Sequence, residues 1–276
     1  MKPAEMIPNE AFEPFCGELL AIPAGAVCGK PFLLTDPAKT KITVGADATA
    51  NIAIRHTTAR EVALSFELAQ NAHLCVVEWF TAEAFVDFHV KQEEGSTCQL
   101  LMSELSSANV RYTMDLLGRG AKSEVDGLFL ATGSDHCVVD LRVNHQAVGC
   151  QSRSLIKGIA SGQAYGEFKG LVYVATGAQQ TDARQTSRNI ELSNQAHIVT
   201  KPQLEIYADD VKCSHGATVG QLDNEAIYYM RQRGLSELQA QRLQVEGFAA
   251  DIILRCPIET FCKQLAADVH TKMETL

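Results

Sequence analysis

Short runs of β-branched and aliphatic residues alternate with small and polar residues from residue 41 to about residue 212, with hardly any helical periodicity. Short, partly alternating runs of this kind predict β-strands. Typical segments are KITVGADATANIAI, EVALSFEL, AHLCVVEWF, TCQLLMSEL, KSEVDGLFLA, CVVDLRVNH, GEFKGLVYVA, RNIELS and PQLEIYA. The pattern therefore predicts a mainly β body.

A weak repeat underlies these strands. A small or amide residue followed by Ala or Ser opens a strand at Gly45-Ala46, Asn71-Ala72, Gly95-Ser96 and Gly120-Ala121, at spacings of 26, 24 and 25 residues. A period of this length in a β-rich chain is typical of a solenoid, in which each coil buries its inward face against its neighbours. The repeat becomes irregular beyond Gly133, so the pattern alone leaves a β-sandwich open as the alternative.

Helical signals replace the strand pattern near residue 221. Asp223 is a good N-cap for the helix NEAIYYMRQR, which should stop at Gly234. Ser236 and Gln239 form a capping box for ELQAQRLQVEGFAADIILR, and Pro257 suits the first turn of IETFCKQLAADVHTKME. We therefore divide the chain into a weakly patterned, proline-rich lead at 1–40, a β core at 41–220 and a C-terminal helical unit at 221–276.

Charge and composition narrow the function classes. The chain has 24 Lys and Arg against 33 Asp and Glu, a net charge of −9, which argues against a role on nucleic acid or on anionic membranes. It has no run of 18 apolar residues and no visible signal peptide, so we expect no membrane span and a cytoplasmic location. The nine scattered cysteines do not form a disulfide pattern, and Cys75, Cys98 and Cys137 read as small hydrophobic residues of strands.

Common catalytic motifs are missing from the sequence. It contains no GxxxxGK[ST] loop, GxSxG, HExxH or CxxC. We therefore expect no ATP hydrolysis by the P-loop route, and any nucleotide energy would come from a partner.

The stretch KCSHGAT holds the strongest candidate for chemistry. In a strand, residues two apart face the same side, so Cys213 and His215 would project together. A thiolate and an imidazole suit zinc, ferrous iron or an iron-sulfur cluster, yet two ligands do not complete a site. Two other readings of Cys213 and His215 remain open at this point. The two residues could be a structural pair at the end of a strand, or a cysteine nucleophile with histidine as its base.

The run AQQTDARQTSRNIELSNQAHIVTKPQLEIYADDVKCSHGATVGQLDNEAIYYMRQRG, residues 178–234, resembles the signature of the SufB/SufD family of iron-sulfur cluster assembly scaffolds. Upstream, from about residue 41 to 170, the resemblance is to the family's general pattern. The SufB branch typically has an acidic residue after the motif histidine. Here Gly216 follows it, as in the SufD branch.

The resemblance implies a right-handed parallel β-helix with a C-terminal α-helical unit that docks on a SufC-like ABC ATPase. It implies a non-catalytic scaffold subunit that binds no nucleotide itself and pairs through its last coils with a SufB-like subunit. Because SufD relatives commonly carry a helical N-terminal domain, the chain resembles a short form, for which a homodimer in a reduced system is the alternative.

The resemblance also assigns roles to residues. His215 matches the histidine implicated in holding a transient iron-sulfur cluster at the subunit interface, together with a cysteine of the SufB partner. Cys213 matches a cysteine of the SufD motif and becomes an auxiliary candidate for a ligand. We expect the ATPase contact around Asp223, Tyr228, Tyr229 and Arg231, because aromatic and arginine side chains dominate such interfaces. The alternative to ATPase binding is that these four side chains pack against other helices of this chain.

Two other classes of β-helix protein compete with the scaffold. An exported carbohydrate-active enzyme, such as a polyuronate lyase, would need an export signal and clustered Asp, Arg or Lys on consecutive coils, and we see neither. A purely structural or adhesive solenoid is disfavoured by the specific motif and the helical tail.

Overall fold

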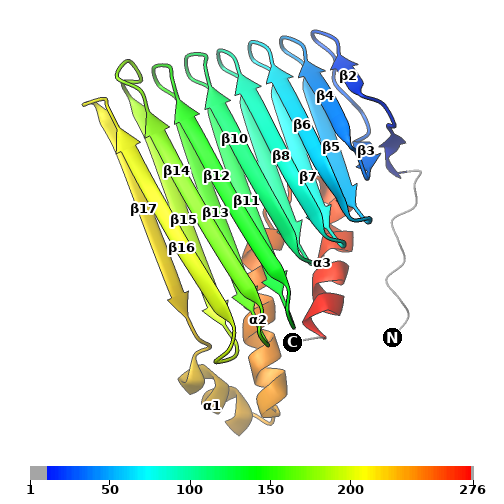
Figure 1. Ribbon diagram of the computed structural model, residues 1–276, viewed down its shortest axis with the longest axis vertical. Helices are drawn as coiled ribbons and strands as arrows, with labels where there is room; N and C mark the ends of the chain where they lie inside the picture. Colours follow the sequence, from blue (N-terminus) through cyan, green and yellow to red (C-terminus); the bar gives the residue numbers. More distant parts are fainter. Residues whose placement is uncertain (1–10, 275–276) are drawn as a thin grey trace.

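The computed structural model describes residues 11–274, in which two parallel β-sheets lie face to face and three helices follow them (Figure 1). Successive strands alternate between the sheets, so each coil contributes one strand to each. All the strand pairs described are parallel. This arrangement confirms the predicted parallel β-helix with C-terminal helices.

The nine-stranded sheet, here called sheet A, contains β1 (Glu13–Pro14), β3 (Phe32–Thr35), β5 (Thr49–His56), β7 (His73–Phe80), β9 (Thr97–Glu104), β11 (Lys122–Ala131), β13 (Gln151–Ala160), β15 (Thr181–Glu191) and β17 (Val211–Gly220). The eight-stranded sheet B contains β2 (Leu19–Ile22), β4 (Lys39–Val44), β6 (Arg60–Leu68), β8 (Ala84–Gln92), β10 (Ala108–Leu116), β12 (His136–His145), β14 (Tyr165–Val174) and β16 (His197–Ile206). The helices are α1 (Asn224–Gln232), α2 (Glu237–Ile253) and α3 (Glu259–Met273).

A column of tight turns accounts for the repeat in the sequence. Asn71 and Gly95 have positive φ values of 55° and 67°, a conformation that favours Gly and Asn. The N–H of Asn71 donates to the carbonyl of Glu94 in the next turn, at 2.8 Å, so the turns stack. The coils later lengthen: Thr49 pairs with His73, 24 residues on, whereas Lys122 pairs with Gln151, 29 residues on. The repeat is lost beyond residue 133 because the coils become longer.

The main core fills the space between the two sheets. Aliphatic side chains from alternate positions form most of it, as the strand pattern predicts. Aromatic residues are few but central, and Phe66 and Phe88 stack with ring centres 4.5 Å apart. The inward faces of neighbouring coils therefore share one continuous apolar interior.

A second core lies on the outer face of sheet A, under α2 and α3 (Figure 1). Trp79 of β7 packs on Phe261 of α3, with ring centres 4.0 Å apart. Leu128 and Ile159 on the sheet and Leu265 on the helix belong to the same cluster. Two helices thus cover one face of the solenoid.

No helix within residues 11–274 is long and apolar enough to cross a membrane.

The predicted helix starts agree with the structure. The Asp223 side chain accepts hydrogen bonds from the backbone N–H groups of Glu225 and Ala226, and both bonds of the Ser236–Gln239 capping box are present. The third helix begins later than expected, at Glu259 after Ile258, which makes no side-chain cap bond.

The structure adds strands to two segments in which the sequence pattern was weak. The weakly patterned lead at 1–40 contains β1, β2, β3 and the start of β4; its residues 1–10 lie outside the described part. These strands are short, and pairing with the following coil provides hydrogen bonds that the local pattern does not reveal. In the polar segment at 180–197, β15 begins at Thr181, before the predicted RNIELS strand, and β13 and β17 pair on both of its sides.

A polar network ties α2 to the apolar outer face of sheet A. The Lys157 ammonium lies 2.9 Å from a carboxyl oxygen of Asp251 and donates to the carbonyl of Phe248 at 2.9 Å. Arg255 bridges Asp251 and Asp126, with nitrogen-to-oxygen distances of 3.4 and 3.7 Å. Burial of Asp126, opposed in part by Arg255, raises the pKa of its carboxyl to about 6.

We expect Asp126→Asn to stabilise the protein at neutral pH. The folded-state pKa of Asp126 is raised above the unfolded one, so its stabilising contribution is complete below about pH 4 and is lost as the pH rises through about 6. The amide should therefore raise the free energy of unfolding by up to about 3 kcal/mol at pH 7 and change it little at pH 4. Urea unfolding of both proteins across this range measures the difference, and an equal effect at both pH values would contradict the assignment.

Candidate functional site

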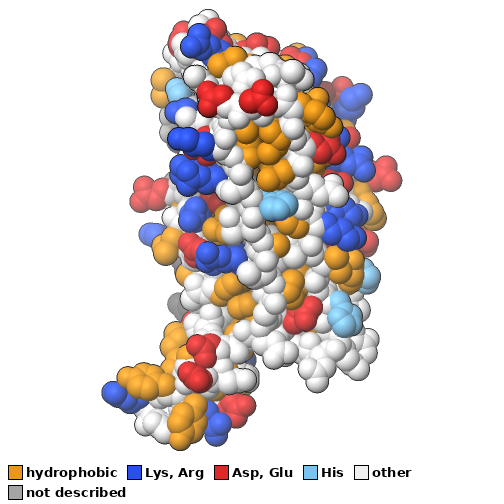
Figure 2. Space-filling model, turned by 90° about the vertical axis from the view of Figure 1, so that its left-hand side faces the viewer, with side chains coloured by type: hydrophobic (Ala, Val, Ile, Leu, Met, Phe, Trp, Pro, Cys, Tyr) orange, Lys and Arg blue, Asp and Glu red, His pale blue; other side chains and the backbone are white. Residues whose placement is uncertain are grey.

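Strand β17 forms an open edge at the end of the solenoid. Within the described residues it pairs with β15 alone, and β16 in the other sheet pairs with β14 alone. The backbone N–H and C=O groups on the outer side of β17 therefore lack strand partners over ten residues. Figure 2 shows this end of the molecule, where hydrophobic side chains gather along the middle and most lysines and arginines lie toward the margins.

Cys213 and His215 lie on β17, as the sequence predicted for an extended segment. Cys213 pairs with Ala183 of β15 and packs, half-buried, on a small apolar cluster at this end of the solenoid. Partial burial raises the pKa of its thiol, and the nearby Asp182 carboxylate adds to the rise. His215 is two residues further on, on the same face by strand alternation, pairs with Gln185 and is exposed.

Cys213 and His215 do not make a metal site by themselves. Among residues 11–274, no group of three or more His, Cys, Asp or Glu residues is placed to hold a metal ion. A raised thiol pKa also argues against Cys213 as a nucleophile activated within this chain, because the reactive form is the thiolate. The geometry therefore fits soft ligands on an open edge that need further ligands from elsewhere.

Helix α1 carries the residues expected to bind a partner, and the structure divides them into two kinds. Tyr228 and Tyr229 are 63% and 57% exposed, and the Arg233 guanidinium lies 5.0 Å from the Tyr229 ring centre. Asp223 instead caps α1, and Arg231 forms an exposed ion pair with Glu237 at 3.1 Å. Asp223 and Arg231 thus have polar partners within the chain, whereas both tyrosine rings remain largely exposed, Tyr229 beside Arg233.

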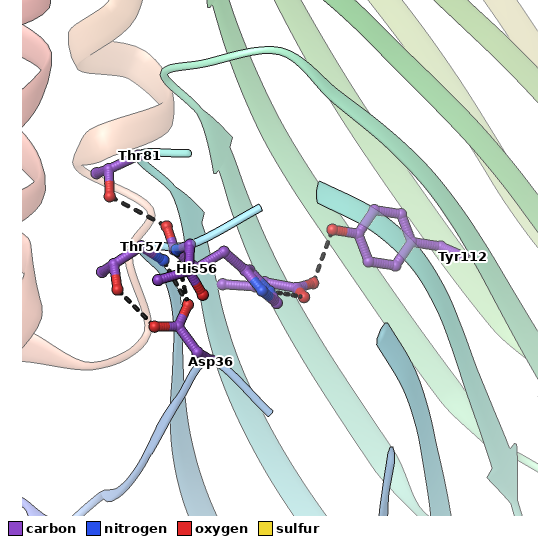
Figure 3. Close-up of polar contacts among 7 residues, drawn as sticks. Asp36, His56, Thr57, Thr81 and Tyr112 are labelled. Carbon is purple, nitrogen blue, oxygen red and sulfur yellow. Dashed lines mark hydrogen bonds and ion pairs between the residues drawn. The ribbon is translucent and has the colours of Figure 1, made fainter. Parts of the chain in front are cut away.

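A buried polar cluster inside the solenoid was not predicted. The Glu78 carboxyl lies between His56 and Tyr112: its Oε1 is 2.8 Å from Nε2 of His56, and its Oε2 accepts a hydrogen bond of 2.8 Å from the Tyr112 hydroxyl (Figure 3). All three side chains are fully buried. In the sequence Glu78 follows four apolar or cysteine residues in HLCVVEW, and only the register shows that it faces inward.

Comparison with known proteins identifies the chain's relatives. Residues 34–248 match the family described as "SUF system FeS cluster assembly, SufBD core domain". The chain belongs to the SufBD core family. The matched span runs from β3 into α2 and includes Cys213, His215 and both tyrosines of α1.

Members of the SufBD core family in several bacteria align with this chain. The iron-sulfur cluster assembly protein SufD of Escherichia coli is 36% identical over 171 residues, which cover 61% of this chain and 40% of the relative. A SufBD family protein of Synechocystis is 38% identical over 162 residues, covering 57% and 34% respectively, and SufD of Bacillus subtilis is 30% identical over 162 residues, covering 59% and 37%. The alignments therefore span less than half the length of these relatives. Two of these relatives are named SufD, which supports a SufD-like place for this chain within the family.

Proposed function

We propose that this chain is a SufD-like, non-catalytic scaffold subunit on which iron-sulfur clusters are assembled at an interface with a second subunit. The observation that carries the proposal is the open strand β17, which presents Cys213 and His215 on one face. Membership of the SufBD core family supports the cluster as the cargo. His215 would be the main ligand from this chain, and Cys213 an auxiliary one.

The shape of the edge favours a shared site. A long unpaired strand is a template for pairing with another chain, which would bury its backbone groups and bring in new side chains. Two soft ligands from one side then need only the partner's contribution to reach the three or four that iron requires. A SufB-like subunit is the partner we propose, with a second copy of this chain as the alternative.

Helix α1 is the proposed contact with a SufC-like ABC ATPase. It lies beyond the end of the sheets, and its two exposed tyrosines provide large apolar area with polar tips. The chain itself binds no nucleotide in this proposal. ATP-driven movement of the partner would reach β17 through the short connection between Gly220 and Asn224.

The proposed site is tested by His215→Ala in the chain co-expressed with SufB-like and SufC-like subunits. We expect the amount of cluster formed on the anaerobically reconstituted complex to fall by at least about tenfold. Loss of a residue that merely hydrogen-bonds to a metal ligand already lowers metal affinity by about tenfold or more, and loss of the ligand itself should cost at least as much. Absorption spectra and iron and sulfide analysis measure the cluster. Unchanged cluster yield would contradict the role of His215.

The double variant Tyr228→Ala/Tyr229→Ala is the matched control. It should weaken binding to the SufC-like ATPase while leaving His215 and the fold intact, whereas His215→Ala should leave ATPase binding unchanged. Size-exclusion chromatography of the chain alone and with each partner distinguishes the heterodimer from the homodimer. A chain that binds neither partner would contradict the proposed scaffold.

A further inference from the structure

The inward wall of sheet A changes character toward β17. One column of paired residues along this wall consists of Ile52, Val76, Leu100, Val125, Ser154, Gln185 and His215. The first four are aliphatic and the last three are polar. The apolar interior of the solenoid thus gives way to polar side chains directly beneath the proposed site.

Gln185 is the most unusual residue of this column. It is 1% exposed, and neither its amide nitrogen nor its amide oxygen has a hydrogen-bond partner among residues 11–274. Leaving both atoms of a buried amide unpaired costs free energy, and native proteins rarely do so without a reason. The amide of Gln185 is therefore available to a group that arrives from outside the described chain or moves toward it.

The opposite sheet leaves room for this amide. A Cβ atom at Gly170 of β14 would lie 2.4 Å from Nε2 of Gln185, closer than non-bonded atoms tolerate. Any other residue at position 170 would therefore force the amide to shift. The interior at this level holds a glycine opposite a glutamine instead of two interlocking apolar side chains.

The register places Gln185 next to His215. The two residues are direct partners in the β15–β17 ladder, on strands that are about 4.8 Å apart, and their side chains leave the sheet on the same face. Among the described residues the His215 ring makes no hydrogen bond, and water has access to it at the open edge. A partner that covered the edge would remove that water and leave the Gln185 amide as the adjacent polar group.

We propose that Gln185 is the positioning residue of His215. Its amide oxygen accepts the N–H of one ring nitrogen of His215, which fixes the tautomer and leaves the other ring nitrogen free to bind iron. Histidines that bind metals generally donate their second ring N–H to such an acceptor, which orients the ring and raises its basicity. This inference rests on the proposed function, because it assumes that His215 is a ligand.

The test uses Co²⁺ as a spectroscopic probe of the co-expressed complex of this chain with a SufB-like subunit. The absorption bands of bound Co²⁺ give both affinity and ligand geometry without any cluster assembly. We expect Gln185→Met, which keeps the length but removes the amide, to lower the Co²⁺ affinity by about 10- to 100-fold and to shift the bands. Gln185→Glu, which keeps an acceptor oxygen, should restore most of the affinity.

Thr200→Val is the matched control, because the Thr200 hydroxyl is also buried and unpaired but lies on sheet B. It should leave Co²⁺ binding unchanged. If His215→Ala weakens Co²⁺ binding and Gln185→Met does not, the positioning role is wrong while the proposed function stands. If His215→Ala itself has no effect on Co²⁺ binding or cluster yield, the proposed function fails, and this inference fails with it.

Discussion

Glu78→Ala is expected to lower the free energy of unfolding by about 3–5 kcal/mol, because it removes the shared partner of a buried imidazole and a buried hydroxyl. His56 and Tyr112 each bond to a different oxygen of the Glu78 carboxyl, and neither side chain reaches water. The truncation also leaves a cavity that the surrounding strands fill only in part. Urea unfolding monitored by circular dichroism measures the loss.

Replacing all three residues of the cluster with apolar ones distinguishes the cost of lost hydrogen bonds from the cost of lost side-chain packing. His56→Leu, Glu78→Met and Tyr112→Phe together fill similar volume and leave no polar atom unpaired, so the triple variant should recover most of the stability. Tyr112→Phe alone should cost less than Glu78→Ala, since the carboxyl keeps its bond to His56. A loss below about 1 kcal/mol for Glu78→Ala would mean that the cluster adds little to stability.

Phe261→Ala is expected to cost about 3–5 kcal/mol and to loosen the helices from sheet A. The Phe261 ring is fully buried against Trp79, at the centre of the second core. Hydrogen exchange should show faster exchange in α2 and α3 than in the wild-type protein, with the strands of the interior core much less affected. Mass spectrometry of deuterated fragments resolves these elements.

Tyr228→Ala is the comparison for this experiment, because Tyr228 is on a helix but 63% exposed. It should change the unfolding free energy by no more than about 0.5 kcal/mol. Equal exchange rates in Phe261→Ala and the wild type would show that the helices are held mainly by the network of Lys157, Asp251 and Arg255.

The β-helix was predictable because its signals are local and repeat. Each coil brings the same turn conformation back to the same column, so Asn71 and Gly95 recur in the sequence as well as in space. The helix starts were predictable for a similar reason, since Asp223 and Ser236 act within their own first turns. The early strands and the first half of β15 gave only weak local signals, because their pairing depends on neighbouring coils, which a local pattern does not contain.

The candidate site was only partly visible in the sequence. Strand alternation was enough to place Cys213 and His215 on one face, but not to show that their strand is an edge. Gln185 lies 30 residues before His215, in a polar stretch where nothing marks it as buried. Only the register of β15 against β17 brings the two together.

Within residues 11–274 the two ends of the solenoid are unequal, which bears on how the proposed pair would form. Among the described residues, β16 and β17 each offer ten residues at one end, whereas β1 and β2 offer two and four at the other. Head-to-tail stacking into fibres needs two matching surfaces on every subunit. In the proposed assembly a partner would cover β16 and β17 together, and the short strands at the other described end would offer little edge for further stacking.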